Sequence, residues 1–420
     1  MLTRRTLLAC GLAAPWFPLR AATDFGGVSK DEFVLGTSAA FSGPSRGLGI
    51  ELYRGATAYF EHVNRAGGIG GRRIRQKIYD DGYQPDPAVT NSTTLMVEDQ
   101  VFLLFGYVGT PTVTRVLPLL KKFQERDMYL FFPFTGAAPQ REPPYGDFAF
   151  NLRASYGQDT AGLVDNFVAV DRRRIAVFYQ ADAYGRSGWA GVRKALARHG
   201  EQIVGEATYK RGTKFTSVMR EQVNILKAAN PDAVICIGSY AACAAFARDA
   251  VDMGLNDVPL ANLSFVGSEN MLKLLSEGRD DAERYTDLLV NSQVVPSYED
   301  VSIPAVREYR DFMARYNPEV PAQLVTEEYT PFAHSFVSLE GFLDAKLMVE
   351  ILRRLGDNPS REGLEQAVFT IRDFDLGIGE RVSFGPERRQ GLQGVYYTVV
   401  DQGRFVTLDD WDRRFANVGA

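Results

Sequence analysis

Short apolar runs alternate with stretches of helical periodicity along most of the chain. The first apolar run, residues 33–39, has the length of a buried strand. In residues 49–64, apolar side chains such as Phe60 and Val63 recur at the spacing of one helix face, and Gly67 follows as a C-terminal helix signal. This part of the chain therefore predicts a strand followed by an amphipathic helix.

The same alternation forms two series. In the first series, further strands are expected at residues 74–79, 101–105 and 129–132, with helices at 87–98 and 112–126. After a strand-like stretch at 148–153, the second series has helices at 156–170, 188–199, 215–229 and 241–253 and strands at 174–179, 203–209 and 233–237. Short apolar strands linked by helices form parallel sheets that are covered on both faces. The pattern predicts an α/β protein with two doubly wound parallel-sheet lobes.

The last third of the chain is less regular. A strand is expected at 288–294, helices at 304–316, 332–355 and 360–369, and β-like segments at 381–384, 395–400 and 404–407. No linker rich in Gly and Ser separates the two series, which favours direct crossovers between the lobes.

The first 22 residues have the composition of an export signal. They contain three arginines and no acidic residue, and the pair Arg4-Arg5 precedes the mostly apolar run 6–19. Paired arginines favour the twin-arginine route. A retained anchor and lipid attachment at Cys10 are the alternatives, and Arg20 stands where a small residue is preferred if cleavage follows Ala22. The segment predicts a periplasmic protein.

Composition and charge exclude several classes of protein. With 45% hydrophobic and 24% charged residues, the chain is typical of a folded, soluble protein. It has 47 Lys and Arg against 52 Asp and Glu, a net charge of −5, and without the three arginines of residues 1–22 the balance is −8. No basic block stands out, so nucleic acid is not an expected partner.

The chain offers little to bind a metal or to catalyse a reaction. The histidines lie far apart, and no Cys/His zinc site or cofactor is expected. The motifs GxxxxGK(S/T), GxSxG and HExxH do not occur, and the glycine-rich stretch 67–71 follows a helix rather than a strand. We therefore expect a protein that is not an enzyme. Cys236 and Cys243 leave two possibilities open, a disulfide or two buried thiols.

A set of motifs along residues 30–400 carries a resemblance to a known family. The motifs lie at residues 35–44, 64–72, 79–81, 106–112, 150–153, 182–185, 265–269 and 338–342. In this order and spacing they resemble the leucine/isoleucine/valine-binding proteins, which are type I periplasmic solute-binding proteins of ABC importers. The resemblance implies two lobes joined by three crossovers, with a ligand held between them by hinge closure.

The implied fold divides the chain into discontinuous lobes. Residues 23–152 and 294–370 are expected in lobe 1, residues 153–293 and 371–410 in lobe 2, and residues 411–420 in a C-terminal tail.

The resemblance also implies a ligand site at the carboxyl ends of the strands, where loops and helix N-termini meet. Thr110 corresponds to the hydroxyl that binds the ligand carboxylate, and Thr135 with the N–H of Gly136 corresponds to a second contact. Tyr184 matches the aromatic residue that closes over the ligand, and Glu269 matches the acceptor of the ligand ammonium. Turn formation, helix capping and packing are the alternative roles of these residues.

Further candidates surround this predicted site. Ser239 and Tyr240 follow a strand of the second series, and which of the two points inward is left open. Tyr107, Phe134 and Tyr156 add aromatic rings, some of which belong to the core, and this surplus favours a ligand larger or more apolar than valine.

Arg153 lies with Tyr156 at the first crossover, where either a ligand contact or hinge support is expected.

These expectations predict the periplasmic solute-binding component of an ABC importer. Its partners would be a small molecule, either an amino acid or a similar carboxylate, and a membrane permease, and the protein would be a monomer. An aromatic acid or lipid-like ligand, and a role as a ligand sensor for a receptor, are the alternatives.

Overall fold

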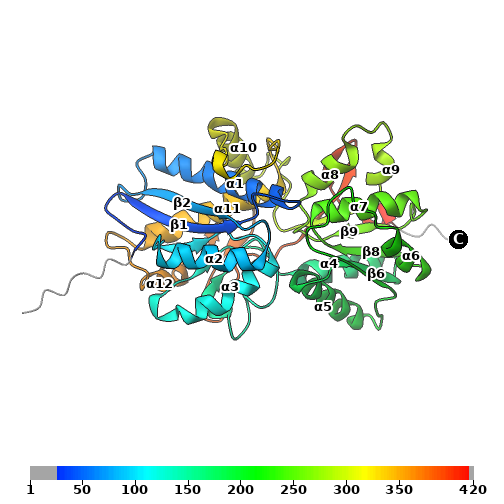
Figure 1. The fold of residues 1–420 in the computed structure, drawn as a ribbon, viewed down its shortest axis with the longest axis horizontal. Coiled ribbons are helices and arrows are strands. Elements are labelled where there is room, and N and C mark those ends of the chain that lie inside the picture. The colour runs from blue at the N-terminus through cyan, green and yellow to red at the C-terminus, as the bar shows by residue number, and fades with distance from the viewer. Residues whose placement is uncertain (1–25, 416–420) are drawn as a thin grey trace, which may run out of the picture.

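The computed structural model describes residues 26–415, which form two α/β lobes lying side by side (Figure 1). Each lobe is built on its own sheet, and helices cover both faces of each sheet. The predicted fold class, two doubly wound lobes, is therefore confirmed. The predicted export signal, with Arg4-Arg5 and Cys10, lies outside the described residues.

The first lobe contains a five-stranded parallel sheet in the order β2-β1-β3-β4-β5. Its strands are β1 (Glu32–Ala39), β2 (Arg73–Asp80), β3 (Leu103–Phe105), β4 (Leu130–Phe131) and β5 (Ala149–Phe150). The three strands β3, β4 and β5 are buried throughout. Strands buried on both faces read as continuous apolar runs, which is why the sequence shows them clearly.

Two groups of helices cover this sheet. One group consists of α1 (Arg46–Arg65), α10 (Pro304–Tyr316) and α11 (Phe336–Arg354), of which α1 and α10 lie above the sheet in Figure 1. The other consists of α2 (Pro85–Val97) and α3 (Thr110–Lys122), and α12 (Leu364–Phe369) packs on α11. The backbones of α1 and α11 approach closely, because a Cβ at Gly55 would lie 1.8 Å from the carbonyl oxygen of Ser338 and one at Gly341 would lie 2.2 Å from that of Leu52.

The second lobe has a seven-stranded sheet in the order β14-β13-β10-β9-β8-β6-β7. Five parallel strands form most of it, namely β6 (Ile175–Gln180), β7 (Glu206–Tyr209), β8 (Ala233–Ile237), β9 (Leu260–Asn262) and β10 (Leu289–Gln293). The antiparallel hairpin of β13 (Tyr396–Asp401) and β14 (Arg404–Thr407) extends the edge at β10. A last short helix, α13 (Trp411–Phe415), ends the described chain.

Helices also cover both faces of the second sheet. They are α4 (Tyr156–Ala169) and α5 (Ala183–Arg198), which pack on each other, and the group α6 (Arg220–Ala228), α7 (Tyr240–Asp252), α8 (Ser268–Ser276) and α9 (Ala282–Thr286). Helices α8 and α9 and strand β9 were not anticipated from the sequence. Helix α5 begins at 183 rather than 188 because the Asp182 side chain accepts a hydrogen bond from the N–H of Tyr184 and caps the helix.

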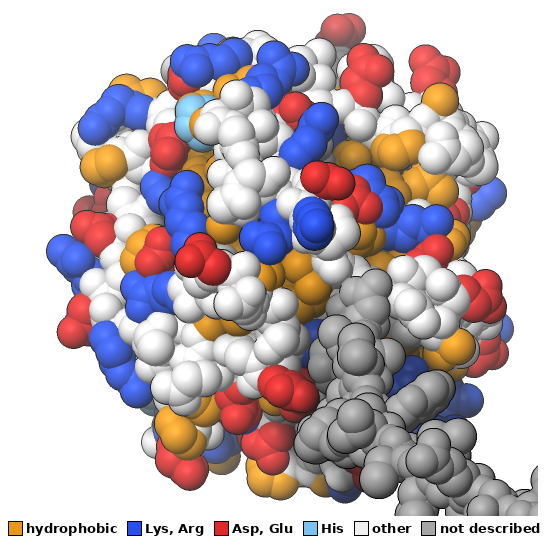
Figure 2. Space-filling view, turned by 90° about the vertical axis from the view of Figure 1, so that its left-hand side faces the viewer, with side chains coloured by type: hydrophobic (Ala, Val, Ile, Leu, Met, Phe, Trp, Pro, Cys, Tyr) orange, Lys and Arg blue, Asp and Glu red, His pale blue; other side chains and the backbone are white. Residues whose placement is uncertain are grey.

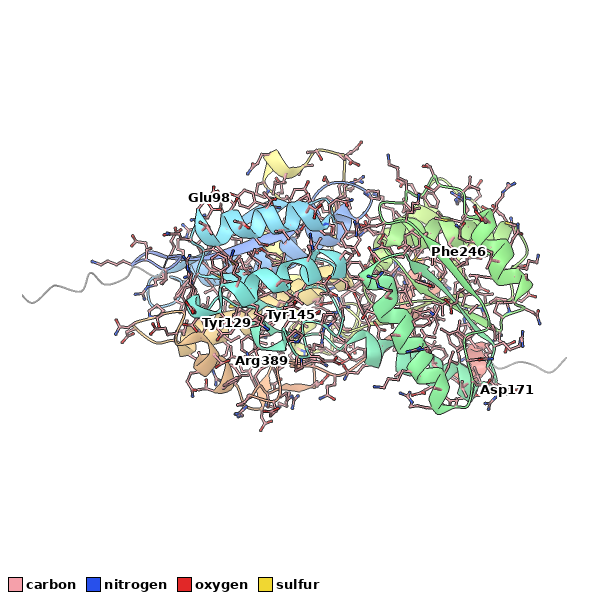
Figure 3. The ribbon with its side chains drawn as sticks, turned by 60° about the horizontal axis from the view of Figure 1, so that its bottom comes forward. Glu98, Tyr129, Tyr145, Asp171, Phe246 and Arg389 are labelled. Carbon is pink, nitrogen blue, oxygen red and sulfur yellow. The ribbon has the colours of Figure 1, made fainter. Side chains whose placement is uncertain are left out.

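The chain crosses between the lobes after β5, after β10 and before β13. The third crossover falls later than the expected position at 370–371. Phe384 lies 5.9 Å from Phe150 of the first sheet, the N–H of Leu392 donates to the carbonyl of Leu152, and the Arg389 guanidinium lies over the Phe150 ring. Figure 3 labels Arg389 on this lobe. Residues 384–392 therefore pack on lobe 1, because Phe384 and Leu392 find their apolar partners there.

Several other features bear on the expected chemistry. Cys236 and Cys243 are both buried and free, so the structure places two separate thiols where the sequence left a disulfide open. Within residues 26–415, no cluster of three or more His, Cys, Asp or Glu side chains could hold a metal ion. No helix in the same range is both long and apolar enough to cross a membrane. Figure 2 shows acidic and basic side chains interspersed on the end of lobe 1.

Candidate functional site

The strand ends of the two lobes face each other and are in direct contact. The Gln180 side chain of lobe 2 donates to the Tyr83 hydroxyl of lobe 1 at 3.2 Å. On the other side of the interface, the N–H of Gly47 in lobe 1 donates to the Tyr240 hydroxyl of lobe 2 at 3.1 Å. These hydrogen bonds define a closed arrangement, and the predicted site residues lie along the interface it forms.

Two hydroxyl groups meet at the lobe 1 side of this interface. Thr110 is the first residue of α3, and Thr135 follows β4; their Oγ1 atoms are 2.6 Å apart. The Tyr156 hydroxyl lies 3.5 Å from Thr110 Oγ1. Gly109 precedes Thr110 with φ +103°, and a Cβ there would lie 2.2 Å from the Tyr83 ring. A larger residue at position 109 would therefore displace the turn that positions Thr110.

Four aromatic rings form a continuous buried group, called here the aromatic cluster: Phe134, Tyr156, Tyr184 and Phe265. Tyr184 lies 5.1 Å from Tyr156 and 4.8 Å from Phe265, and Phe134 lies 5.3 Å from Phe265. All four are at most 1% exposed. Gly136 permits this packing because a Cβ at that position would lie 2.6 Å from the Tyr156 ring.

The cluster joins both lobes to the first crossover. Phe134 belongs to lobe 1, Tyr184 and Phe265 to lobe 2, and Tyr156 begins α4 immediately after the crossover. The Tyr184 hydroxyl has no hydrogen-bond partner in the part of the chain that the structure describes. A buried hydroxyl without a partner costs about 1–3 kcal/mol. This atom is therefore available to a bound molecule that carries a donor or an acceptor.

Arg153 brings a cationic group into contact with the aromatic cluster. Its guanidinium lies 4.5 Å from the centre of the Phe134 ring, Nη2 donates to Ser264 Oγ, and Nε lies 3.6 Å from Glu340 Oε1. Among residues 26–415, Nε and Nη1 have no hydrogen-bond partner. Glu340 raises the pKa of Arg153 against the opposing effect of burial, so the side chain stays cationic.

Glu269 lies in the first turn of α8 and reaches across to lobe 1. Its Oε1 accepts a hydrogen bond from the N–H of Phe336, the first residue of α11, at 3.0 Å. Burial raises the pKa of Glu269 to about 7, and the nearby Glu51 carboxylate acts in the same direction. The residue matched to an ammonium acceptor thus has one oxygen bound across the interface, whereas its Oε2 has no hydrogen-bond partner among residues 26–415.

The remaining predicted residues occupy different places. Tyr107 packs in a second apolar core of lobe 1, where its hydroxyl pairs with Ser92 Oγ at 2.9 Å, so the structure does not bring it to the interface. The sequence around Tyr107 did not predict this orientation, because successive side chains in a loop point in different directions. The N–H of Ser239 donates to the Tyr209 hydroxyl within lobe 2, whereas Tyr240 contacts lobe 1.

The structure thus gathers Thr110, Phe134, Thr135, Gly136, Tyr156 and Tyr184 into one group, with Tyr240 and Glu269 contacting lobe 1 separately. Sequence reasoning missed Ser264 and Phe265, and it left the role of Arg153 undecided. The motif at 265–269 contained the signal for Phe265, but only the fold shows that its ring meets Phe134 and Tyr184.

A cavity of about 600 Å³ opens at the outer edge of the interface, next to Tyr240. Residues of both lobes line it, including Arg46, Glu327 and Tyr329 from lobe 1 and Lys214, Tyr240 and Lys273 from lobe 2. The aromatic cluster and the hydroxyl pair are not among the residues that line this cavity.

Comparisons with known proteins agree with this architecture. A family model described as "Periplasmic binding protein" matches residues 32–404. Leu/Ile/Val-binding protein homolog 3 of Brucella melitensis is 24% identical over 250 residues, which are 59% of this chain and 66% of that protein, just under two thirds.

Solved structures match over greater lengths. The crystal structure of a possible leucine/isoleucine/valine-binding protein from Rhodopirellula baltica SH 1 has a TM-score of 0.80 and 29% identity, and the match covers 94% of this chain and 99% of that one. A fatty acid ABC transporter substrate-binding protein from Thermomonospora curvata shares the fold, with a TM-score of 0.76 and 19% identity. The match covers 93% of this chain and 96% of that one. The matched family and these structures are substrate-binding proteins, not enzymes. The chain therefore belongs to the periplasmic binding protein family and has the type I fold of the leucine/isoleucine/valine-binding proteins that its motifs resemble.

Proposed function

We propose that the protein binds a small carboxylate between its lobes and delivers it to the membrane permease of an ABC importer. The observation that carries this proposal is the hydroxyl pair of Thr110 and Thr135 at the start of α3, which meets the aromatic cluster where the two lobes close. Hydroxyl groups and the N-terminus of a helix both favour an anionic group.

Family membership and the relatives support this proposal. The family implies a periplasmic location, and the basic, apolar segment 1–22 is the expected means of export. The Brucella relative and the Rhodopirellula structure are both named for leucine, isoleucine and valine, and the Thermomonospora structure is named for a fatty acid. All of these ligands carry a carboxylate.

Closure supplies the mechanism. A ligand that contacts both lobes stabilises the closed arrangement by its difference in affinity for the closed and open forms. A dissociation constant of ~1 μM corresponds to about −8 kcal/mol. A few charge-assisted hydrogen bonds and the burial of an apolar side chain are enough to supply this free energy.

Small-angle scattering and calorimetry on the protein without residues 1–22 test the proposal. The ligands are leucine, valine, phenylacetate, benzoate and octanoate, and we expect at least one of them to bind with an equimolar stoichiometry and to reduce the radius of gyration. Thr110→Val and Thr135→Val should each weaken that binding about tenfold, since a charge-assisted hydrogen bond contributes ~1.5–3 kcal/mol. Thr93→Val, on the exposed face of α2, is the matched control.

Failure of all five carboxylates to bind, or binding that leaves both threonine variants unaffected, would contradict the proposal. The same samples show whether the protein is a monomer, as the sequence predicts, through the mass obtained by light scattering.

A further inference from the structure

We propose that the ligand is an aromatic carboxylate, with its carboxyl group bound by Arg153 together with the hydroxyl pair of Thr110 and Thr135, and its ring held by the aromatic cluster. This inference rests on the proposed function and assigns the class of ligand. Two observations carry it: the unpartnered nitrogens of a buried guanidinium, and the aromatic cluster, one ring of which lies against that guanidinium.

The first observation is the hydrogen bonding of Arg153. A guanidinium has five N–H donors, and this one is only 2% exposed. The structure provides one hydrogen bond, to Ser264, and a longer ion pair of 3.6 Å with Glu340. Within the described chain, Nε and Nη1 lack a hydrogen-bond partner. Nε and Nη1 lie on opposite edges of the guanidinium, so a carboxylate can pair with one of them together with the second N–H of Nη2 and form two parallel N–H···O bonds at once.

The acidic groups around Arg153 do not satisfy its donors. Asp159 Oδ2 accepts hydrogen bonds from the N–H and the hydroxyl of Ser264 rather than from Arg153. Burial raises the pKa of Glu340 to about 7 and that of Asp344 well above its usual value. The Arg153 guanidinium therefore has one hydrogen-bond partner, Ser264, and one carboxylate at the longer distance of 3.6 Å, Glu340.

The second observation is the chemistry of the surroundings. The guanidinium lies on the face of Phe134, and the other three rings of the aromatic cluster continue from there. An aromatic ring buries about 150–250 Å² and prefers offset or edge-to-face contact with other rings. The cluster contacts the hydroxyl pair through Tyr156 and the guanidinium through Phe134, and these surroundings suit a molecule with an acidic group on an aromatic body.

Glu269 is the residue matched to the ammonium group that an amino acid would bring. Its Oε1 accepts the N–H of Phe336 across the lobes, and its Oε2 has no hydrogen-bond partner within the described chain. The leucine arm of the experiment below therefore tests whether this oxygen accepts a ligand ammonium.

Isothermal titration calorimetry of the protein without residues 1–22 tests the inference at pH 7, with phenylacetate, benzoate, octanoate and leucine as probes. We expect phenylacetate or benzoate to bind at least tenfold more tightly than leucine and octanoate. Arg153→Gln should reduce that affinity at least thirtyfold, and Arg153→Lys, which keeps the charge but loses the fork, should reduce it about tenfold. Arg193→Gln, an exposed arginine on α5, is the matched control and should change nothing.

The outcomes separate this inference from the proposed function. Tight binding of leucine or octanoate with no response to the aromatic acids would overturn the inference and leave the proposed function intact. Aromatic acids that bind equally well to both Arg153 variants would overturn the role of the arginine. If Arg153→Gln fails to fold, the variants Arg153→Lys and Phe265→Leu test the inference instead. Both keep the buried volume close to that of the wild type, and both should weaken the binding of phenylacetate. If no probe binds, the proposed function fails as well.

Discussion

Replacing Glu269 by glutamine should remove a pH dependence of stability that this one buried carboxyl group creates. The carboxyl is 6% exposed, and its pKa rises from 4.5 to about 7 when the lobes bury it. The protonated form is the one that suits the buried site. Its contribution to stability is therefore fully present below pH 4.5 and is lost as the pH rises through 7.

The size of the effect follows from the shift in pKa. A difference of one unit is worth about 1.36 kcal/mol, so a shift from 4.5 to about 7 makes the free energy of unfolding fall by roughly 2–3 kcal/mol between pH 5 and pH 8. Glutamine resembles the protonated acid in shape and cannot ionise. The Glu269→Gln variant should lack this component, and the Phe336 N–H can still donate to its amide oxygen.

Urea unfolding of the wild type and the variant at pH 5, 6, 7 and 8 measures the difference directly. The exposed Glu277, at the end of the same helix, provides the control substitution Glu277→Gln, which should retain the pH dependence that Glu269 creates. A constant difference between the wild type and Glu269→Gln would refute the reasoning. It would mean that Glu269 keeps its contact with water and that the lobes of the free protein do not close on it.

Three further substitutions or modifications test other parts of the structure. Gly47→Ala should weaken the binding of a closing ligand about tenfold, measured by calorimetry, because its Cβ would lie 2.6 Å from the Asn270 side chain of the other lobe; an unchanged affinity would contradict the closed contact. Phe246→Ala, at the residue labelled in Figure 3, should lower the unfolding free energy by about 3–5 kcal/mol, since the side chain is fully buried and stacked; a loss below 1 kcal/mol in urea unfolding would speak against that packing. Cys236 and Cys243 should react with a thiol reagent only after unfolding, because burial raises the pKa of both thiols; rapid labelling of the native protein would exclude their burial.

The sequence alone determined the order of strands and helices, because each is recorded by the spacing of a few neighbouring residues. Strand β8 and helix α10 have the predicted boundaries, 233–237 and 304–316. Elements with a short apolar pattern, or with a pattern interrupted by polar residues, were not predicted; β9 and α9 are examples. The third crossover was placed too early because the apolar residues 384 and 392 do not show which lobe they will pack on.

The candidate site could be located in the sequence only as a set of loops. Thr110 and Tyr107 lie three residues apart, yet one faces the other lobe and the other enters a core beside Ser92. Two glycines in this loop, at 106 and 109, have positive φ angles, and such turns set the direction of each side chain independently of its spacing.

The tertiary structure decided which distant side chains meet. Arg153 belongs to no periodic stretch of the sequence. Its contact residues Phe134, Ser264 and Glu340 belong to both lobes. Sequence spacing encodes the face of a helix or strand because the backbone there repeats. Contacts between separate loops depend on how whole lobes pack and close, and the spacing of neighbouring residues in the sequence does not determine this packing.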